Sequence, residues 1–488
     1  TSPGQNFKVS APARGAGEPF DYVSIAGYEH LVPVYERNAR KINEVIVGFA
    51  VENEPVFMYD YNPHVMKAYH NWLKKQFTDI ADFNRKMKSS YKDFSEVYPP
   101  SSGKRFTRPA EWINFNQFRL DNQAGYIRWQ ADIIKQVEPE LIVITKPNHS
   151  YGTGAAIARG NDSWKMGWSQ LGKTGINIYC RESGFVSKSS TQMDMIRSGG
   201  NGQLMWMTEF GLSPFQGLPG SKLIPRVRAS EMIYSMALHG MEKIFLYQIG
   251  SARRNPTSYL RGDYFPTDSM ISMAERQVEL SALGSMNNFQ PKRKAAIYYS
   301  RLSSIMGKPD PGKDTADVHG MLQHLNYQVD YIDLQQALQG KLKEYDMLYI
   351  QQSPYIDNKL SGLLKKYVEN GGVVVMEGPS GIYDVWSGKY KVAPANLADL
   401  FGASLVKSGG DMDLSFDDEI SVKTKVGGFR INKPDYSLKV LSGTVVMANS
   451  ENGQPLVVKH RFGSGYTILI SFPLGENYKK ILEKNSKV

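Results

Sequence analysis

The sequence predicts an α/β protein, with a parallel barrel or open sheet in its first 288 residues and a second, smaller α/β domain after it. Three observations predict this. Short apolar runs alternate with helical patterns up to about residue 288. Polar residues gather where these runs end, which is typical of the carboxyl ends of parallel strands. After about residue 405 the pattern becomes alternating and turn-rich, which indicates antiparallel strands.

Five apolar runs in the first 288 residues are predicted as parallel strands. Each is rich in Val, Ile, Leu or Met, and helical patterns separate them. One helix is expected to start at Pro63, because proline favours the first helical turn, and a long helix is expected from Trp112 to Val137. The segment PFDYVSI is a weaker, sixth candidate strand. The five runs are 45–55, 140–149, 176–183, 202–211 and 243–250.

The later part of the chain divides into two regions. Residues 289–405 again alternate apolar runs with helical patterns, and Asn370-Gly371-Gly372 is a good C-terminal stop for one of the helices. Residues 406–488 alternate apolar and polar residues, and Asn452-Gly453 between two such runs predicts a β-hairpin. The predicted domains are therefore 1–288, 289–405 and a β-rich region at 406–488.

Composition argues against several kinds of protein. The single cysteine, Cys180, rules out an internal disulfide and a cysteine-based zinc cluster, and the eight histidines lack metal-binding spacing. We therefore predict no metal and no cofactor. The net charge of +10 indicates an anionic partner or merely a basic surface, and without a recognisable motif nucleic acid is not expected. No stretch approaches the roughly 20 apolar residues of a membrane span.

Two of the predicted strands end in a glutamate. Val45 to Pro55 reads VIVGFAVENEP and Gly202 to Gly211 reads GQLMWMTEFG, so Glu54 and Glu209 are expected at the same edge of the sheet. Two carboxyl groups about 5 to 5.5 Å apart suit a retaining glycosidase, in which one attacks the anomeric carbon and the other acts as acid and base. Asn53 can bind a substrate hydroxyl beside Glu54. For either glutamate alone, a solvated acid in a strand-end loop is the alternative.

Aromatic residues near these strand ends are candidates for contact with a sugar. Tyr179 ends the strand between the two glutamates, where its hydroxyl could hold the nucleophile ionised, although a core or rim tyrosine is equally consistent. Trp164 and Trp168 are the preferred stacking platforms. Trp206 precedes Glu209 by three residues, so regular alternation places it on the opposite face, and we interpret it as packing.

The motifs NEP at Asn53–Pro55 and TEFG at Thr208–Gly211 resemble the strand-four acid/base and strand-seven nucleophile motifs of the clan A glycoside hydrolases. More narrowly, HNWLKKQFTDIADFNRKMKSSYKDFSEVYPP and ALHGMEKIFLYQ are similar to segments of the bacterial family 42 β-galactosidases. The resemblance covers nearly the whole chain. It implies a (β/α)8 TIM barrel, then a flavodoxin-like or glutamine-amidotransferase-like α/β domain that forms trimers, and a C-terminal antiparallel β region.

Carried over residue by residue, the resemblance implies that Glu54 is the acid/base, Asn53 binds the sugar 2-hydroxyl and Glu209 is the nucleophile of a retaining β-galactosidase-type hydrolase. Amidotransferases use a cysteine, and none follows Cys180, so the second domain is expected to be structural and to make a homotrimer. The implied substrate is a β-linked galactoside. The implied protein is soluble and bacterial, with its compartment, cytoplasmic or periplasmic/secreted, left open.

Two features depart from the family pattern. Only 44 residues precede Val45, too few for three βα units, so we expect the N-terminal part of the barrel to be missing from this chain. The strand ends are also unusually basic, which suits sulphate or carboxylate and makes a sulphated, carrageenan-type algal galactan an alternative substrate. Solvated or locally paired side chains would explain the basic residues equally well. The polar candidates for substrate binding are Lys146, His149, Arg181, Gln248 and Arg253.

A noncatalytic carbohydrate-binding protein on a degenerate barrel is the competing hypothesis. The short N-terminal part motivates it. The presence of both glutamates at matching strand ends argues against it, because binding alone does not need the pair. An amidotransferase-type enzyme centred on the second domain is excluded by the missing cysteine.

Overall fold

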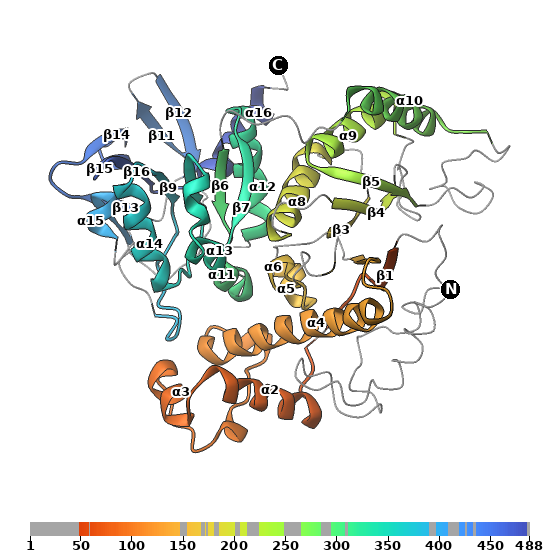
Figure 1. The fold of residues 1–488 in the computed structure, drawn as a ribbon. Coiled ribbons are helices and arrows are strands. Elements are labelled where there is room, and N and C mark those ends of the chain that lie inside the picture. Colours follow the sequence, from red (N-terminus) through yellow and green to blue (C-terminus); the bar gives the residue numbers. More distant parts are fainter. Residues whose placement is uncertain are drawn as a thin grey trace. The chain divides into compact units, whose positions relative to one another are not determined.

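The structure is a computed structural model of two compact units, each described by its own elements (Figure 1). Unit 1 comprises Thr1–Leu73 and Asn116–Gln290, and unit 2 comprises Lys74–Phe115 and Pro291–Val488. The structure describes residues 48–57, 59–146, 154–166, 171, 174–179, 185–200, 205–211, 224–247, 265–284, 294–307, 311–389, 397–407, 419–424, 427–432 and 436–485.

Unit 1 alternates strands with helices, as the apolar runs predict, and its helix α2 begins at Pro63 as expected. The strands are β1 (Gly48–Asn53), β2 (Ile142–Lys146), β3 (Thr174–Tyr179), β4 (Met205–Gly211) and β5 (Met241–Leu246). The helices that lie wholly or partly in unit 1 are α2 (Pro63–Gln76), α4 (Pro109–Val137), α5 (Gly154–Ala158), α6 (Ser163–Met166), α8 (Phe185–Gly199), α9 (Arg226–Leu238) and α10 (Asp268–Leu283).

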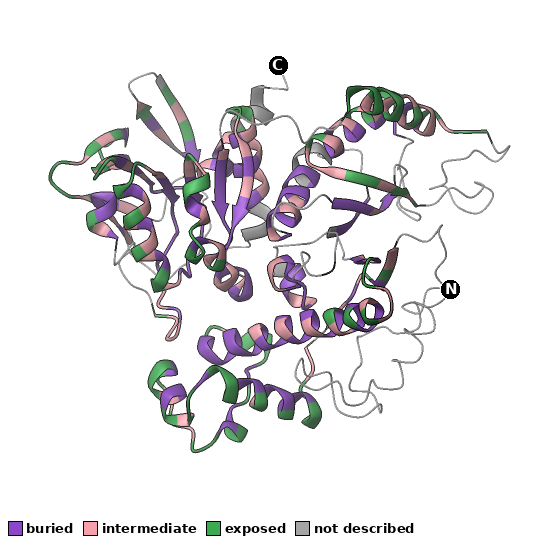
Figure 2. Ribbon diagram, viewed as in Figure 1, coloured by how far each residue is buried: buried purple, intermediate pink, exposed green. Residues whose placement is uncertain are grey.

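The strand pairings of unit 1 are parallel throughout the described residues. β1 pairs with β2, and β3, β4 and β5 pair in that order. Figure 2 shows β4 buried along most of its length, whereas β5 carries exposed residues. Parallel strands whose order follows the chain are the units of a (β/α)8 barrel. Closure of the barrel remains a prediction.

Gly175 of β3 lies directly against β2. A Cβ atom added to it would lie 2.4 Å from the carbonyl oxygen of Thr145 and 2.9 Å from the side chain of Ile144. We therefore expect Gly175→Ala to lower the free energy of unfolding by about 1–3 kcal/mol, because backbone must move to admit the methyl group. Denaturant unfolding measures this, with Gly103→Ala as the control because a Cβ there meets nothing within 4 Å. Equal stability of the two variants would contradict the close packing of β3 on β2.

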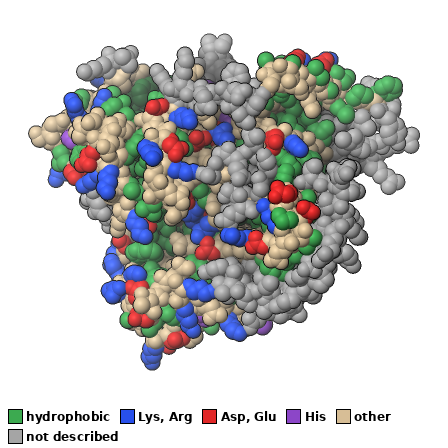
Figure 3. Space-filling view, viewed as in Figure 1, with side chains coloured by type: hydrophobic (Ala, Val, Ile, Leu, Met, Phe, Trp, Pro, Cys, Tyr) green, Lys and Arg blue, Asp and Glu red, His purple; other side chains and the backbone are tan. Residues whose placement is uncertain are grey.

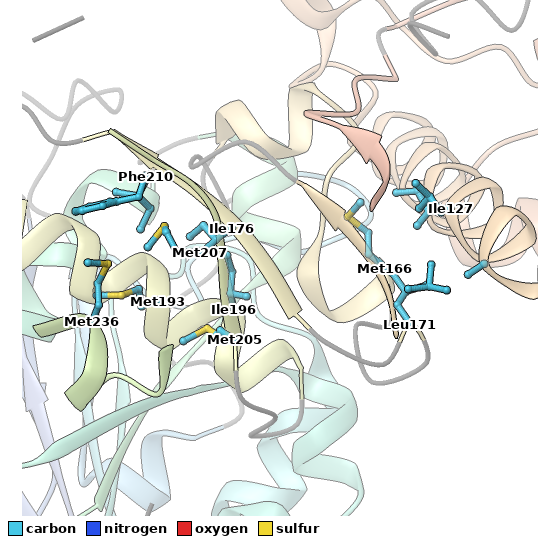
Figure 4. Packing of buried hydrophobic residues seen from close by; sticks show 14 of the residues in the cluster. Ile127, Met166, Leu171, Ile176, Met193, Ile196, Met205, Met207, Phe210 and Met236 are labelled. Atoms are coloured by element: carbon cyan, nitrogen blue, oxygen red, sulfur yellow. The ribbon is translucent and has the colours of Figure 1, made fainter. Parts of the chain in front are cut away.

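The core of unit 1 is rich in methionine and lies between the strands and their helices. Figure 4 shows Met207 of β4 beside Met193 of α8 and Met236 of α9. Met205 and Phe210 of β4 belong to the same buried cluster. The unbranched methionine side chains can fill irregular gaps between a twisted sheet and its helices. The core-facing residues of β4 thus fall at positions 205, 207 and 210, a spacing that becomes important at the site.

Unit 2 combines an α/β layer with antiparallel strands. Its strands are β6 (Lys294–Tyr298), β7 (Gln328–Ile332), β8 (Met347–Ile350), β9 (Val373–Glu377), β10 (Ala403–Lys407), β11 (Glu419–Thr424), β12 (Gly427–Asn432), β13 (Tyr436–Val440), β14 (Val445–Ser450), β15 (Pro455–Phe462) and β16 (Gly465–Ile470). Its helices are α3 (Ile80–Met87), α11 (Arg301–Met306), α12 (Pro311–His324), α13 (Leu334–Leu338), α14 (Asn358–Glu369), α15 (Ala398–Phe401) and α16 (Leu474–Asn485), with 3-10 turns at Phe94–Glu96, Ser102–Lys104 and Lys341–Glu344.

Most strands of unit 2 form one mixed sheet in the order β12-β11-β14-β15-β16-β9-β8-β6-β7. Pairing is antiparallel from β12 to β16 and parallel from β16 to β7. The predicted hairpin is confirmed, because β14 and β15 pair across Asn452-Gly453 and Gly453 has a φ of 80°. The predicted helix stop is also confirmed, since α14 ends before Asn370 and Gly371 has a φ of 99°.

The domain boundaries drawn from the sequence remain predictions, and two observations bear on them. The mixed sheet crosses the boundary at residue 405, because β16 pairs in parallel with β9. Unit 2 also includes Lys74–Phe115, which the prediction places in the first domain. Two hydrogen bonds fix this segment to α11: Trp112 Nε1 donates to the carbonyl of Ile305 at 3.0 Å, and Arg105 Nε donates to that of Met306 at 2.9 Å.

Candidate active site

Glu54 and Glu209 lie at the carboxyl ends of β1 and β4, as predicted. Glu54 is the first residue after β1, and its φ of 50° lies in the left-handed region that few residues other than glycine adopt. Its backbone N–H donates to the carbonyl oxygen of Lys146, the last residue of β2. Glu209 is 8% exposed. The strained backbone at Glu54 is thus held by the neighbouring strand, an arrangement that is common at functional sites.

A one-residue bulge in β4 determines where Glu209 points. From Met207 to Phe210, β4 advances three residues while β5 advances two, and the pairing with β3 shifts at the same place. Met207 and Phe210 both belong to the methionine-rich core, so the inserted residue turns Glu209 to the other face. Regular alternation from Met207 would point Glu209 into that core. The bulge therefore takes the carboxyl group away from apolar helices and presents it at the site.

The same bulge overturns the prediction for the face of Trp206. Regular alternation places Trp206 opposite Glu209, but the extra residue in β4 puts both side chains outside the methionine-rich core. The interpretation of Trp206 as packing still holds. It is 4% exposed, its Nε1 donates to the Glu242 carboxylate at 2.9 Å, and Lys243 lies over its ring.

A matching bulge in β1 precedes Glu54. From Ala50 to Asn53, β1 advances three residues while β2 advances two. As a result, two consecutive residues, Val51 and Glu52, are buried, and Asn53 is exposed. Each candidate catalytic glutamate therefore lies within or directly after a bulge of its own strand.

Lys146 forms an ion pair with Glu209. Its Nζ lies 2.9 Å from Oε1 of Glu209, and the two side chains are 25% and 11% exposed. The sequence predicts Lys146 as a substrate-binding residue, whereas the structure places its ammonium on the candidate nucleophile. Because the backbone carbonyl of Lys146 also accepts from Glu54, this one residue touches both glutamates.

Asn177 of β3 links Glu54 to Thr208, the residue before Glu209. Its Nδ2 donates to Oε1 of Glu54 at 3.4 Å, and its Oδ1 accepts from the hydroxyl of Thr208 at 2.7 Å. The Thr208 hydroxyl also lies 2.9 Å from the carbonyl oxygen of Ile176, so its one proton is shared between the two acceptors. Asn177 is fully buried, and sequence reasoning missed it. Its signal was a polar residue within an apolar strand, on the face of the candidate Tyr179 two residues later.

Glu52 has the most strongly shifted pKa of the described acids near the site. It is 3% exposed, and its Oε1 accepts from Nε2 of Gln130 on α4 at 3.0 Å. Burial raises the pKa of Glu52 to about 8, against the opposing effect of side-chain hydrogen bonds from Gln130 and Tyr126. The fold therefore binds this proton more tightly than the unfolded chain does. Its contribution to stability is present at low pH and falls as pH rises from about 4.5 to about 8.

Arg119 of α4 fixes the loop that follows Glu54. Its guanidinium is fully buried, donates to the carbonyls of Phe57 and Ala158, and lies over the ring of Tyr59 at 3.9 Å. Burial lowers the pKa of Arg119 to about 10, so the group stays charged at neutral pH. The amide of Asn161 adds a 3.0 Å hydrogen bond to the carbonyl of Pro55. The chain after the candidate acid/base is thereby tied to the loop after α5.

The remaining predicted contacts are only partly visible. Asn53 ends β1 and is exposed beside Glu54, and Trp164 is half-buried on α6. The backbone of Tyr179 ends β3, but its side chain is not described, so its predicted bond to the nucleophile remains a prediction. The other candidates lie outside the described residues, namely Trp168, His149, Arg181, Gln248 and Arg253.

The surface charge and the arrangement of possible metal ligands give little further information about the site. On the face drawn in Figure 3, Lys and Arg side chains are interspersed with Asp and Glu side chains. Among the residues that the structure describes, no group of three or more His, Cys, Asp or Glu side chains could hold a metal ion. Within the same part of the chain, no helix is both long and apolar enough to cross a membrane.

Comparisons with known proteins agree with this geometry. Residues 29–262 match the model of the glycoside hydrolase 42 family, described as β-galactosidase, and residues 310–426 match a GLMA-like second domain. Residues 29–262 are thus similar to glycoside hydrolase family 42. The matched range contains Glu54, Lys146 and Glu209.

Curated proteins and solved structures extend the likeness along most of this chain. The β-galactosidase BgaH of Haloferax lucentense is 20% identical over 368 residues, which cover 70% of this chain and 54% of that protein. The β-galactosidase structure from Rahnella sp. R3 has a TM-score of 0.79 and 17% identity, covering 96% of this chain and 72% of the other. A family 42 exo-carrageenase from Bacteroides ovatus has a TM-score of 0.56 and 14% identity, covering 86% and 66%. The chain thus spans about half the length of its curated relative.

Proposed function

We propose that this chain carries the active site of a retaining β-glycosidase of the β-galactosidase type. The observation that supports it best is the pair of strand-end glutamates, which both contact Lys146, with Asn177 bound to Glu54 and to Thr208, the residue before Glu209. Two carboxyl groups held at one site by fixed side chains are what double displacement requires. The curated relative named above is a β-galactosidase, which favours galactosides over other β-glycosides.

In the proposed mechanism, Glu209 is the nucleophile and Glu54 the acid/base. Glu209 attacks the anomeric carbon while Glu54 gives its proton to the leaving oxygen, which leaves a glycosyl ester on Glu209. Glu54, now a carboxylate, removes a proton from water, and the hydroxyl displaces Glu209 with the original β configuration restored. Asn53, exposed beside Glu54, is proposed to bind the sugar 2-hydroxyl.

Lys146 has a proposed role in this cycle through its contact with Glu209. The ammonium orients the carboxylate for attack and stabilises it again as a leaving group when water breaks the glycosyl ester. The basic residue that the sequence assigns to an anionic substrate is thus already paired within the site. Any role in sulphate capture falls to the predicted residues outside the described part of the chain.

Lys146→Met is expected to lower kcat/KM by roughly 10- to 100-fold, because it removes the positive charge beside Glu209 while keeping the length of the lysine side chain. Initial rates on an aryl β-galactoside measure it. Lys165→Met is a matched control, since Lys165 is also 25% exposed and pairs with a carboxylate, Asp121, away from the two glutamates. Activity of Lys146→Met within twofold of the control would exclude a role for the ion pair in the reaction.

A sulphated galactan of carrageenan type is the second candidate substrate. The only support for it beyond the basic strand ends is the fold shared with the exo-carrageenase of Bacteroides ovatus. Hydrolysis of neutral and sulphated galactans, together with nitrophenyl β-glycosides, tests both substrates. Hydrolysis of neutral galactosides that sulphation does not improve would remove the carrageenan proposal. Glycan binding without hydrolysis of any member of the panel would instead favour the noncatalytic alternative.

The proposed assembly is a homotrimer formed through unit 2, by analogy with the trimer-forming domain that the sequence resembles. The match of residues 310–426 to a GLMA-like second domain is compatible with a structural role there. Light scattering coupled to gel filtration distinguishes a trimer from a monomer.

A further inference from the structure

We propose that Glu52 is a positioning residue for the acid/base: its side chain, bound to Gln130 of α4, fixes the bulge in β1 that presents Asn53 and Glu54 to substrate. The inference rests on the proposed role of Glu54. It adds a residue that touches neither the other glutamates nor the substrate, and that acts through the conformation of the strand end.

The geometry explains how such an action is transmitted. Glu52 lies two residues before Glu54, inside the bulge, and its side chain is anchored on the helix side of β1. On the other side, Glu54 is held by the carbonyl of Lys146 and the amide of Asn177. The backbone between these anchors has little freedom, because Glu54 already adopts a positive φ. Loss of the hydrogen bond between Glu52 and Gln130 would let the end of β1 relax toward regular alternation of its side chains. Asn53 and Glu54 would then turn away from their present directions.

The groups around Glu52 are uncharged, and their hydrogen bonds offset only part of the burial that favours its neutral form. From α4 it faces the Gln130 amide and the Tyr126 hydroxyl. From β2 the only titratable residue is Lys146, whose ammonium is on Glu209. The exposed charges of α4 nearest in sequence, Arg128 and Asp132, pair with each other at 3.7 Å. Within these described elements no cation is placed to compensate an ionised Glu52, so ionisation would draw its side chain toward water.

The consequence is a second alkaline loss of activity. Any acid/base glutamate must be protonated for the first step, so its ionisation lowers kcat/KM with a slope of −1 in a logarithmic plot against pH. Ionisation of Glu52 at pH of about 8 would then loosen the bulge as well. The slope should therefore become steeper than −1 just above pH of about 8.

The experiment compares the full chain with Glu52→Gln and Glu52→Ala. Glu52→Gln keeps the shape and the hydrogen bond but cannot ionise, so we expect kcat/KM within about threefold of wild type at pH 6.5 and a slope that stays near −1 up to pH 9.5. Glu52→Ala should lose about 10-fold or more, mainly in kcat, since orientation rather than binding is disturbed. Glu111→Gln is the matched control and should keep the wild-type dependence of kcat/KM on pH. Glu111 is also a buried glutamate, and it lies on α4 bound to Arg108 and Tyr91.

Hydrogen exchange of the segment 48–57 separates failure of this proposal from failure of the proposed function. After correction for the intrinsic pH dependence, exchange should quicken above pH 8 in wild type and in Glu111→Gln but not in Glu52→Gln. If no substrate is cleaved, this exchange pattern alone still supports the positioning role. Either of two results overturns the inference. The first is that segment 48–57 exchanges at the same rate in wild type and in Glu52→Gln on both sides of pH 8. The second is that an active wild-type enzyme and Glu52→Gln show the same dependence of kcat/KM on pH.

Discussion

Glu209→Ala is expected to lower hydrolysis of aryl β-galactosides by on the order of 10⁴-fold or more, because the variant has no group that can form the glycosyl ester. Loss of the carboxylate also leaves Lys146 without its partner, but methionine at position 146 tests that effect separately. Initial-rate measurements at saturating substrate are sufficient. Glu242→Ala on the neighbouring strand β5 is the control, since Glu242 accepts from Trp206 and has no proposed part in catalysis.

Azide gives Glu209→Ala a diagnostic product. The cavity left by the carboxylate admits a small anion on the nucleophile side, and Glu54 can still protonate the leaving oxygen. A single displacement by azide inverts the anomeric carbon, so the product should be the α-galactosyl azide. Nuclear magnetic resonance of the product distinguishes the two anomers. Activity of Glu209→Ala near that of the Glu242→Ala control would remove Glu209 from the mechanism.

The sequence was sufficient to predict the two glutamates and the strands that carry them. A β-branched, apolar run that stops at Glu-Asn-Glu-Pro or Thr-Glu-Phe-Gly contains both the strand and its polar end, so Glu54 and Glu209 could be recognised locally. The parallel pairing of β3, β4 and β5 followed from the alternation of strands and helices. These features depend on residues that are close together in the chain.

The bulges and the ion pair could not be predicted, because each depends on residues that pairing brings together from distant parts of the chain. The extra residue in β4 is defined only against β3 and β5, and it reverses the face that simple alternation assigns to Trp206. From the sequence alone, Lys146 is interpreted as a basic residue that faces solvent. Only the folded strand β2 shows that it lies beside Glu209. Glu52 looks like one of three polar residues at a strand end, and only Gln130 on α4 shows that it is buried.

The surroundings of Glu52, Glu54 and Glu209 differ in ways that suit the different roles proposed for these residues. Glu52 is sequestered on the helix side, where burial favours its neutral form. Glu209 is paired with an ammonium, as suits a group that must act as an anion. Glu54 is half-buried and accepts a hydrogen bond from the uncharged amide of Asn177, beside the exposed Asn53. The two bulges separate these environments within a few residues.

Glu54→Ala should depend on the leaving group, unlike Glu209→Ala. Substrates with an unactivated sugar leaving group need the proton, so their kcat/KM should fall by about 10²- to 10⁴-fold. Dinitrophenyl β-galactoside needs no protonation and should still form the ester quickly, giving a burst of phenolate followed by slow turnover because no base activates water.

Azide then distinguishes the roles of the two residues by stereochemistry. In Glu54→Ala it should attack the ester on Glu209 from the acid/base side, so two inversions give the β-galactosyl azide, the opposite anomer from Glu209→Ala. The neutral, isosteric Glu54→Gln should behave like Glu54→Ala with unactivated substrates, because an amide keeps the hydrogen bond to Asn177 but supplies no proton. An equal fall for activated and unactivated substrates would mean that Glu54 shapes the site without transferring a proton. Identical azide anomers from the two alanine variants would mean that the roles assigned to β1 and β4 are wrong.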